Sequence, residues 1–251
     1  MRAVTLVTGA SAGLGAEFAR QCSKRGDDLA LVARRRDRLE DVAAQIQGKV
    51  HIFAADLAAP DAAVGLINEI EAEGLAVKTL INNAGFGLGG RFAELALERQ
   101  REMIDLNVRT LTELCRLVLP GMIERGRGAI LNVASTAAFQ PGPNMAVYYA
   151  TKAYVLSFTE ALHHELRRKG IKVSALCPGP TATEFFDVAG VADSILARMS
   201  ADARGVVTAG LRGLERNKAV IVPGLSNKIG AQGSRFLPRA AMRRIVGAIK
   251  V

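Results

Sequence analysis

The sequence predicts an α/β fold, in which one doubly wound parallel sheet of about seven strands carries helices on both faces. Apolar runs of strand length alternate with segments of helical periodicity along most of the 251 residues. The apolar runs are nearly continuous, which is typical of parallel strands buried on both faces. No linker or low-complexity segment interrupts the pattern. We therefore expect a single domain over residues 1–251.

Strands are expected where a short apolar run lies between turn-forming residues. The expected strands are residues 3–8, 28–33, 50–54, 77–82, 129–134, 171–176 and 219–222. Helices are expected between them, where apolar residues recur every three or four positions. The expected helices are residues 13–26, 37–47, 61–73, 97–125 and 145–168. We expect the helix over residues 97–125 to be disturbed at Pro120. Polar residues that follow these strands should meet, because the carboxyl ends of parallel strands share one edge of a sheet.

The composition argues against a membrane-spanning protein. Apolar residues make up 49% of the chain, yet no uninterrupted apolar run reaches the roughly 18 residues that a span needs. The first residues enter a strand-like run directly and show no secretory signal. The three cysteines lie far apart without the spacing of metal ligands. We therefore expect free thiols, no bound metal and a cytoplasmic location.

A glycine-rich loop, TGASAGLG at residues 8–15, joins the first expected strand to the first helix. Glycines let the backbone approach a pyrophosphate, and the helix N-terminus stabilises its negative charge. The loop therefore indicates a dinucleotide site, although its glycine spacing differs from the usual fingerprint. A simple tight turn is the alternative interpretation.

The end of the second strand bears on the choice of dinucleotide. An acidic residue there binds the ribose 2′-hydroxyl of NAD, whereas an arginine accommodates the 2′-phosphate of NADP. This chain has Ala33-Arg34-Arg35-Arg36 at that point and no carboxylate. A guanidinium fork suits a phosphate, so Arg34 and Arg35 predict NADP(H). Arg36 fits better as a solvated charge that opens the next helix.

Tyr148, Tyr149 and Lys152 lie on the expected helix 145–168. Side chains three or four positions apart on a helix are neighbours, so either phenol could pair with the ammonium. A nearby lysine favours the phenolate and is expected to lower the tyrosine pKa from about 10. Such a phenol can pass a proton to or from a substrate oxygen. The spacing alone is also compatible with an ordinary helix edge.

These motifs together resemble the short-chain dehydrogenase/reductase family over roughly residues 3–190. The loop 8–15 is similar to the family's Thr-Gly-x-x-x-Gly-x-Gly, residues 82–85 match Asn-Asn-Ala-Gly, and residues 148–152 fit Tyr-x-x-x-Lys. Ser135 lies thirteen residues before Tyr148, as the family's catalytic serine does. Asn107 falls where the family has its catalytic asparagine. The last sixty residues match only loosely.

The resemblance implies a Rossmann-type fold, an oxidoreductase activity and a role for each catalytic residue. Ser135 would orient the substrate oxygen, Tyr148 rather than Tyr149 would move its proton, and Lys152 would tune Tyr148 and bind the nicotinamide ribose. Asn107 would position a water in a proton relay. The expected cofactor-binding residues are Gly9, Ser11, Gly13, Leu14, Gly15, Arg34, Arg35, Asp56, Leu57, Asn83, Ala84, Gly85, Tyr148, Lys152, Pro178, Gly179, Thr181 and Thr183.

Apolar residues near the expected strand ends predict the substrate pocket. The expected substrate contacts are Phe86, Ala137, Phe139, Met145 and Phe185, each of which could instead be ordinary packing. A largely apolar pocket with few polar anchors suits a lipophilic or acyl-type carbonyl substrate. In this family the last sixty residues shape that pocket, so residues 190–251 are expected to form a lid region and a tail. A homodimer or homotetramer is implied by the resemblance alone.

The tail is strongly basic. The net charge is +9, and eight Lys or Arg residues but no carboxylate follow Glu215. Residues 239–250 are expected to form an amphipathic helix with Met242, Ile245, Val246 and Ile249 on one face. Such a helix can lie on an anionic membrane, or its apolar face can bury against the body or a second subunit. Nucleic-acid-binding motifs are absent.

The leading hypothesis is an NADP(H)-dependent oxidoreductase that acts on a small-molecule carbonyl or secondary alcohol. The alternative is a catalytically idle NADP-binding regulator, or a membrane-surface protein, on the same fold. The complete set of Ser135, Tyr148, Lys152 and Asn107 argues against an idle protein, because cofactor binding alone does not need an acid/base set.

Overall fold

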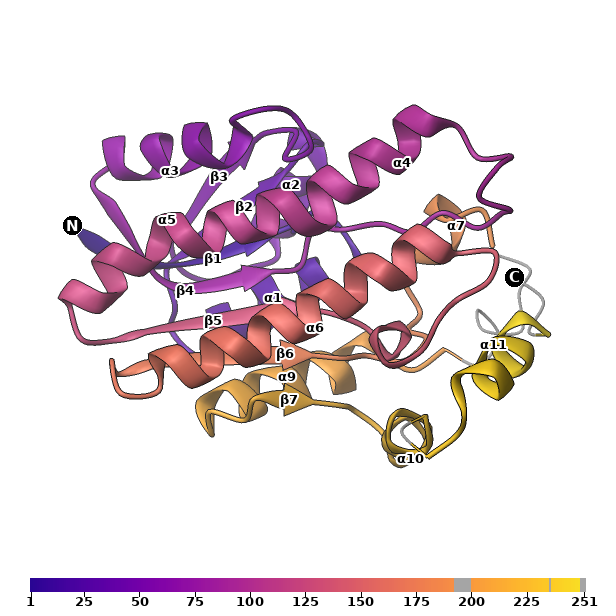
Figure 1. The fold of residues 1–251 in the computed structure, drawn as a ribbon. Coiled ribbons are helices and arrows are strands. Elements are labelled where there is room, and N and C mark those ends of the chain that lie inside the picture. Colours follow the sequence, from indigo (N-terminus) through magenta and orange to yellow (C-terminus); the bar gives the residue numbers. More distant parts are fainter. Residues whose placement is uncertain (192–199, 235, 249–251) are drawn as a thin grey trace.

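The computed structural model describes residues 1–191, 200–234 and 236–248, and they form a seven-stranded parallel sheet of order β3-β2-β1-β4-β5-β6-β7 (Figure 1). Its strands are β1 (Arg2–Thr8), β2 (Leu29–Ala33), β3 (Val50–Ala54), β4 (Leu75–Asn82), β5 (Gly128–Val133), β6 (Ile171–Leu176) and β7 (Val220–Ile221). Every neighbouring pair is parallel. The predicted single-domain, Rossmann-type α/β fold is confirmed.

Helices cover both faces of the sheet (Figure 1). One face carries α1 (Gly13–Ser23), α2 (Arg36–Ala44) and α9 (Ala203–Glu215); the other carries α3 (Ala62–Ala72), α5 (Leu111–Glu124) and α6 (Ala146–Leu166). Phe18, Leu39 and Val207 lie in the first of the two cores, and Leu114 and Val155 lie in the second. Each helix thus buries one apolar stripe, which is the source of the periodicity in the sequence.

The long helix expected over residues 97–125 is three helical segments in one line (Figure 1). They are α4 (Leu97–Ile104), the π-helical segment η1 (Asp105–Thr110) and α5. The expected disturbance at Pro120 is wrong, because α5 continues through that residue. The buried side chains of Leu114 and Met122 pack in the core on either side of Pro120 and favour the helix despite the lost hydrogen bond. The irregular turn lies at η1 instead.

The carboxyl-terminal part contains elements that the periodicity did not predict. These are α7 (Phe185–Val188), α9 and α10 (Leu225–Gly233). The expected terminal helix is present as α11 (Arg239–Gly247), whereas Ile249 and Lys250 lie outside the described residues. Met242 and Val246 of α11 are buried, but Ile245 is exposed. Within the described ranges, no helix is both long and apolar enough to span a bilayer.

A buried polar network ties α6 to the sheet. Asn82 Nδ2 of β4 donates to Asn132 Oδ1 of β5 at 2.9 Å, and Asn132 Nδ2 donates to Thr159 Oγ1 of α6 at 3.0 Å. All three side chains are buried. Hydrogen bonds of this kind have directional requirements that apolar contacts lack, so they set where α6 lies along the sheet. This matters because α6 carries Tyr148 and Lys152.

Replacing Asn132 with Ala should destabilise the protein. The change deletes both bonds and leaves a small cavity, so we expect a loss of about 2–4 kcal/mol in the free energy of unfolding. Urea denaturation followed by circular dichroism measures it. The matched control is Asn68→Ala on the exposed side of α3, which should change stability by less than about 0.5 kcal/mol. Equal effects at the two positions would contradict the structural role of the network.

Candidate active site

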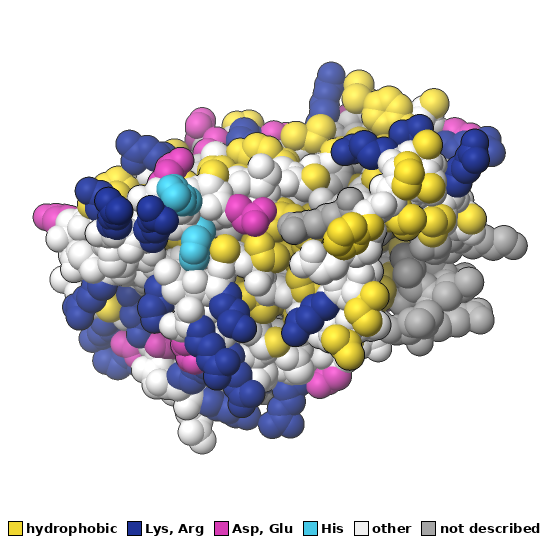
Figure 2. Space-filling view, turned by 60° about the horizontal axis from the view of Figure 1, so that its bottom comes forward, with side chains coloured by type: hydrophobic (Ala, Val, Ile, Leu, Met, Phe, Trp, Pro, Cys, Tyr) yellow, Lys and Arg dark blue, Asp and Glu magenta, His cyan; other side chains and the backbone are white. Residues whose placement is uncertain are grey.

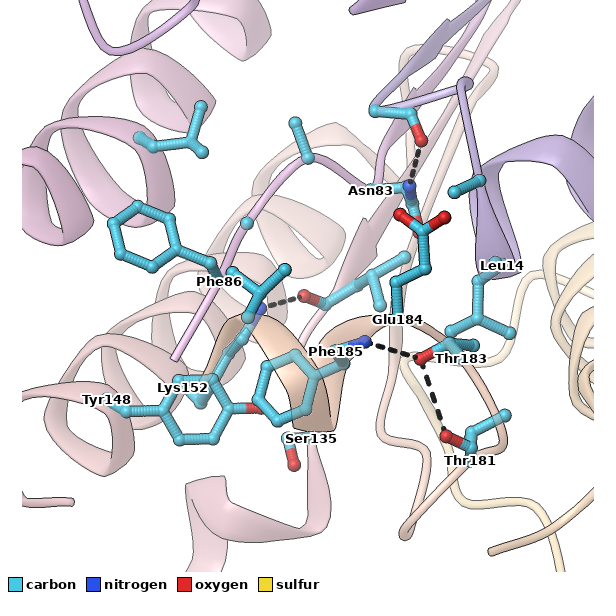
Figure 3. A pocket seen from close by; sticks show the side chains of 18 of the residues that line it. Leu14, Asn83, Phe86, Ser135, Tyr148, Lys152, Thr181, Thr183, Glu184 and Phe185 are labelled. Atoms are coloured by element: carbon cyan, nitrogen blue, oxygen red, sulfur yellow. Dashed lines mark hydrogen bonds between the residues drawn. The ribbon is translucent and has the colours of Figure 1, made fainter. Parts of the chain in front are cut away.

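A cavity of about 510 Å³ lies beyond the carboxyl ends of the strands. Strand order reverses between β1 and β4, because β2 follows on one side of β1 and β4 lies on the other. The loops after these two strands separate and leave a crevice, which is where open parallel sheets bind ligands. The cavity is lined by residues that follow the carboxyl ends of β1, β2, β3, β4, β5 and β6, together with the start of α6. Figure 3 shows part of this lining.

Two hydrogen-bonded loops form the floor of the crevice. Thr8 Oγ1 accepts the backbone N–H groups of Asn83 and Ala84, each at 2.9 Å, and Asn83 Nδ2 donates to the carbonyl oxygen of Thr8 at 2.9 Å. These bonds join the end of β1 to the end of β4. A side chain at Gly15 would not fit here, because its Cβ would lie 2.1 Å from the carbonyl oxygen of Gly9. The lack of a side chain at Gly15 therefore lets α1 lie close to the backbone of Gly9.

The glycine-rich loop is shaped for an anion. Gly9 and Gly13 have φ values of +64° and +53°, which glycine adopts without strain. Ala12 precedes α1, and no side chain caps that helix. The first N–H groups of α1 are thus available to a pyrophosphate, so the residues present fit a dinucleotide.

The arginines at the tip of β2 lie at the edge of the same cavity. Arg34 and Arg35 both line it. Arg35 Nη2 lies 2.9 Å from Glu184 Oε2 and 3.5 Å from Ser11 Oγ. Glu184 comes from the segment after β6, so this ion pair bridges opposite walls of the crevice. Both side chains are about half exposed, which leaves them able to exchange partners.

Ser135, Tyr148 and Lys152 meet at the inner end of the cavity (Figure 3). Tyr148 and Lys152 project from the first turns of α6 and are buried. Lys152 Nζ donates to the carbonyl oxygen of Val133 at 2.8 Å and lies 5.9 Å from the centre of the Tyr148 ring. Ser135 Oγ accepts the N–H of Ala137 at 3.1 Å. Its hydroxyl proton is therefore left for another acceptor.

Burial controls the pKa values of this group. It raises the pKa of Tyr148 to about 12, although a hydrogen bond with Ser135 acts in the opposite direction. It lowers the pKa of Lys152 to about 8. The expectation that Lys152 lowers the tyrosine pKa below its ordinary value is therefore wrong for the protein without cofactor, because desolvation of the phenolate dominates. At neutral pH the phenol holds its proton and can donate it.

Asn107 is buried behind the cavity wall in η1. Its Oδ1 accepts the N–H of Phe86 at 3.1 Å, and its Nδ2 donates to the Phe86 carbonyl at 2.9 Å and to Thr151 Oγ1 at 3.1 Å. A Cβ at Gly85 would lie 2.8 Å from Asn107 Oδ1 and 3.5 Å from Lys152 Nζ. The side chain thus anchors the backbone after β4 beside Lys152. The expected role in a water relay stays a prediction.

Comparison with known proteins identifies the family. The family model described as short chain dehydrogenase matches residues 3–190. The chain belongs to the short-chain dehydrogenase family. Members are oxidoreductases that act on carbonyl or alcohol groups with nicotinamide cofactors. The family predicted from the motifs is thus confirmed.

Three relatives of this short-chain dehydrogenase illustrate the range of the family. The very-long-chain 3-oxoacyl-CoA reductase of Rattus norvegicus is 34% identical over 188 residues, which are 72% of this chain but only 60% of that protein. Sulfoacetaldehyde reductase 2 of Chromohalobacter salexigens is 38% identical over 189 residues, 74% of this chain and 75% of that protein. The structure of a short-chain dehydrogenase from Sphingobium yanoikuyae in complex with NADPH is 33% identical, with a TM-score of 0.84 over 100% of this chain and 97% of that one.

Most of the predicted site residues lie together in the cavity lining. Those that line it are Gly9, Ser11, Gly13, Leu14, Arg34, Arg35, Asp56, Leu57, Asn83, Ala84, Gly85, Phe86, Ser135, Ala137, Met145, Tyr148, Lys152, Pro178, Gly179, Thr181, Thr183 and Phe185. Gly15 and Asn107 support the lining from outside. The structure does not support Phe139 as an expected substrate contact. It ends the short helix η2 (Thr136–Phe139), lies outside the lining and packs against the core under α5 and α6.

Several lining residues were not predicted. Glu184 reaches the cofactor crevice, and Arg99 and Glu102 of α4 border the substrate end. Arg99 forms an ion pair with Glu102 and lies 4.7 Å from the centre of the Phe86 ring. No local motif marks these residues, since they reach the cavity only through the packing of α4 and the path after β6. In the described part of the chain, no group of three His, Cys, Asp or Glu residues could hold a metal.

Lys152→Met should change how stability depends on pH. Below pH 8 the wild-type lysine is charged in both the folded and the unfolded protein, and the folded state carries the desolvation cost. Between pH 8 and 10.5 the folded protein loses that proton first, so Lys152 alone should contribute up to roughly 3 kcal/mol of stability across this window. Burial raises the pKa of the Cys22, Cys115 and Cys177 thiols to about 12, so these groups lower the stability of both proteins above pH 9. Urea denaturation at pH 7 and pH 10 should therefore show the difference in unfolding free energy between wild type and Lys152→Met shifting in favour of the wild type. Identical pH dependence in both proteins would contradict the lowered lysine pKa.

Proposed function

We propose that this protein is an NADP(H)-dependent oxidoreductase that transfers hydride between nicotinamide and a carbonyl or secondary alcohol on a lipophilic or acyl-type substrate. The observation that carries the proposal is the grouping of Ser135 with the buried side chains of Tyr148 and Lys152 at the inner end of a dinucleotide crevice. The short-chain dehydrogenase family supplies the reaction class.

The chain's own residues account for the proton chemistry. The bound nicotinamide supplies or accepts the hydride. Ser135 Oγ, which already accepts the N–H of Ala137, donates to the substrate oxygen and stabilises the charge that develops there. Tyr148 gives its phenolic proton to the same oxygen. The Lys152 ammonium, held by the Val133 carbonyl, stabilises the phenolate that remains. In the opposite direction Tyr148 takes the proton back.

Asn107 is proposed to keep this geometry in place. By bonding both backbone groups of Phe86, it fixes the chain segment that passes over Lys152. Its bond to Thr151 ties the same segment to α6, one residue from Lys152. Asn107 therefore couples η1, the loop after β4 and the catalytic helix. We also propose that it completes a relay through which Lys152 exchanges protons with solvent.

The preference for NADP(H) is supported by the tip of β2. Arg34 and Arg35 line the crevice, and the sequence has no carboxylate there that could take the ribose 2′-hydroxyl instead. The relative from Sphingobium yanoikuyae binds NADPH. Gly9, Gly13 and the open N-terminus of α1 are the proposed pyrophosphate contacts, together with the other lining residues expected from the sequence.

The substrate class is supported by the apolar end of the cavity. Phe185 packs on Tyr148 with ring centres 5.3 Å apart, and Phe86 and Met145 extend this wall. Arg99, which is paired with Glu102, lies at this end too, but the side chains that pack directly around Tyr148 are apolar. We therefore favour a lipophilic or acyl-type carbonyl over a small anionic aldehyde. The lid role of residues 190–251, the homodimer or homotetramer and the cytoplasmic location stay predictions, and residues 192–199 lie outside the described ranges.

Tyr148→Phe should abolish turnover without abolishing cofactor binding. Loss of the proton donor is expected to lower kcat about 100-fold or more, while the dissociation constant for NADPH stays within about twofold of the wild type. NADPH oxidation with a panel of 3-oxoacyl thioesters and lipophilic ketones measures the first quantity, and fluorescence titration measures the second. Tyr149→Phe is the control and should retain activity. If wild type binds NADPH but reduces none of the panel, the idle-regulator alternative is favoured.

Arg35→Ala and Glu184→Gln should move the NADPH affinity in opposite directions. Removing the guanidinium should raise the KM for NADPH about tenfold or more and leave that for NADH nearly unchanged. Glu184→Gln removes the carboxylate that competes with a 2′-phosphate for Arg35, so the KM for NADPH should fall. Steady-state kinetics with both cofactors tests this. Comparable wild-type rates with NADPH and NADH would contradict the assignment of Arg34 and Arg35.

A further inference from the structure

An apolar surface covers the carboxyl-terminal helices. In the described residues after β7, the exposed large apolar side chains are Leu225, Ile229, Phe236, Leu237 and Ile245. We call them the α10–α11 surface. Phe236, in the connection between the two helices, is 84% exposed. Figure 2 views the molecule from the side of these helices and shows hydrophobic side chains gathered on the right-hand part of this face.

The packing of the two helices leaves these side chains outside the core. On α11, Met242 and Val246 take the buried positions. On α10, Ala231 is buried, whereas Leu225 and Ile229 lie one turn apart on an outward face. The apolar stripe expected on α11 is therefore largely used for folding, and the outward stripe belongs to α10. An exposed apolar patch of this kind marks an interaction site.

The charges around the patch indicate the occupant. Lys228, Arg239, Arg243 and Arg244 are all exposed, and no carboxylate follows Glu215 in the sequence. Cations around an apolar patch match a bilayer with anionic head groups. A second copy on the same patch would bring like charges together. A nucleic acid would neutralise the cations but leave Phe236 and Ile229 facing water.

We propose that the α10–α11 surface docks on an anionic lipid bilayer. Leu225, Ile229 and Phe236 enter the head-group region, and Arg239, Arg243 and Arg244 contact lipid phosphates. Helix α10 packs against η2, and Ala137 of η2 is part of the cavity wall, so docking holds the substrate end of the cavity near the membrane. The proposal depends on this surface alone and stands whether or not the protein reduces a carbonyl.

Vesicle co-sedimentation of the full chain tests the proposal. The probes are vesicles of equimolar phosphatidylcholine and phosphatidylglycerol, compared with vesicles of phosphatidylcholine only. At low salt the wild type should partition roughly tenfold or more in favour of the anionic vesicles, and added salt should weaken the binding. Arg243→Gln combined with Arg244→Gln should lower the partition by a similar factor.

The apolar part is tested with a matched pair of variants. Ile229→Ser with Phe236→Ser should lower partition into anionic vesicles roughly tenfold or more. The control is Ile123→Ser at the exposed end of α5, at the other end of the molecule (Figure 1), and it should bind as the wild type does. Circular dichroism and NADPH binding confirm that each variant is folded.

Three outcomes would overturn the proposal. The first is a wild type that does not sediment with anionic vesicles at low salt. The second is undiminished binding by Ile229→Ser with Phe236→Ser. The third is a wild type that does not bind vesicles, forms an oligomer in sedimentation velocity and loses that oligomer in Ile229→Ser with Phe236→Ser. The surface would then be a contact between copies of this chain.

Discussion

The reversal of strand order between β1 and β4 is the constraint on which the site depends. It opens the crevice, and Thr8 keeps its two sides in register by accepting the N–H groups of Asn83 and Ala84. Because both donors bond to Thr8, the path of the backbone from Asn83 toward Phe86 is fixed at its start. Asn107 then holds that path from the other side. One hydroxyl and one amide thus position the wall that faces Tyr148 and Lys152.

At neutral pH, Lys152 is held where its charge costs stability, whereas Tyr148 is buried in its neutral form. Burial raises the pKa of Tyr148 and lowers that of Lys152, so both charged forms are disfavoured in the folded protein without ligand. The Val133 carbonyl offsets only part of the cost for the ammonium. The network of Asn82, Asn132 and Thr159 secures α6 against the sheet at a second point. Helix α6 is therefore fixed by neutral hydrogen bonds in its middle, and near its start it carries the unfavourable desolvation of the Lys152 ammonium.

The parts of the structure that follow local rules were predictable from the sequence. Strand and helix periodicity located all seven strands of the sheet, including β7. Residues at strand ends indicated Ser135 and Arg35, and the Tyr-x-x-x-Lys spacing on a helix indicated Tyr148. Phe139 was misassigned because its direction depends on how η2 meets α6, which no local pattern encodes. Pro120 was misjudged for a similar reason, since core packing outweighs a local helix breaker. Glu184 and Arg99 reach the cavity through tertiary packing, so no motif marked them.

The ion pair between Arg35 and Glu184 shows how cofactor choice can depend on a residue outside the recognised motif. A guanidinium without a partner would give up only weakly bound water to a phosphate, whereas here a carboxylate from the segment after β6 already pairs with it. A 2′-phosphate must replace that carboxylate, and the net gain is smaller than the phosphate–arginine contact alone would provide. NADH does not need this exchange. Under the proposed preference for NADP(H), Glu184 would therefore narrow the difference in affinity between NADPH and NADH that the arginines create, and the segment after β6 would take part in setting selectivity.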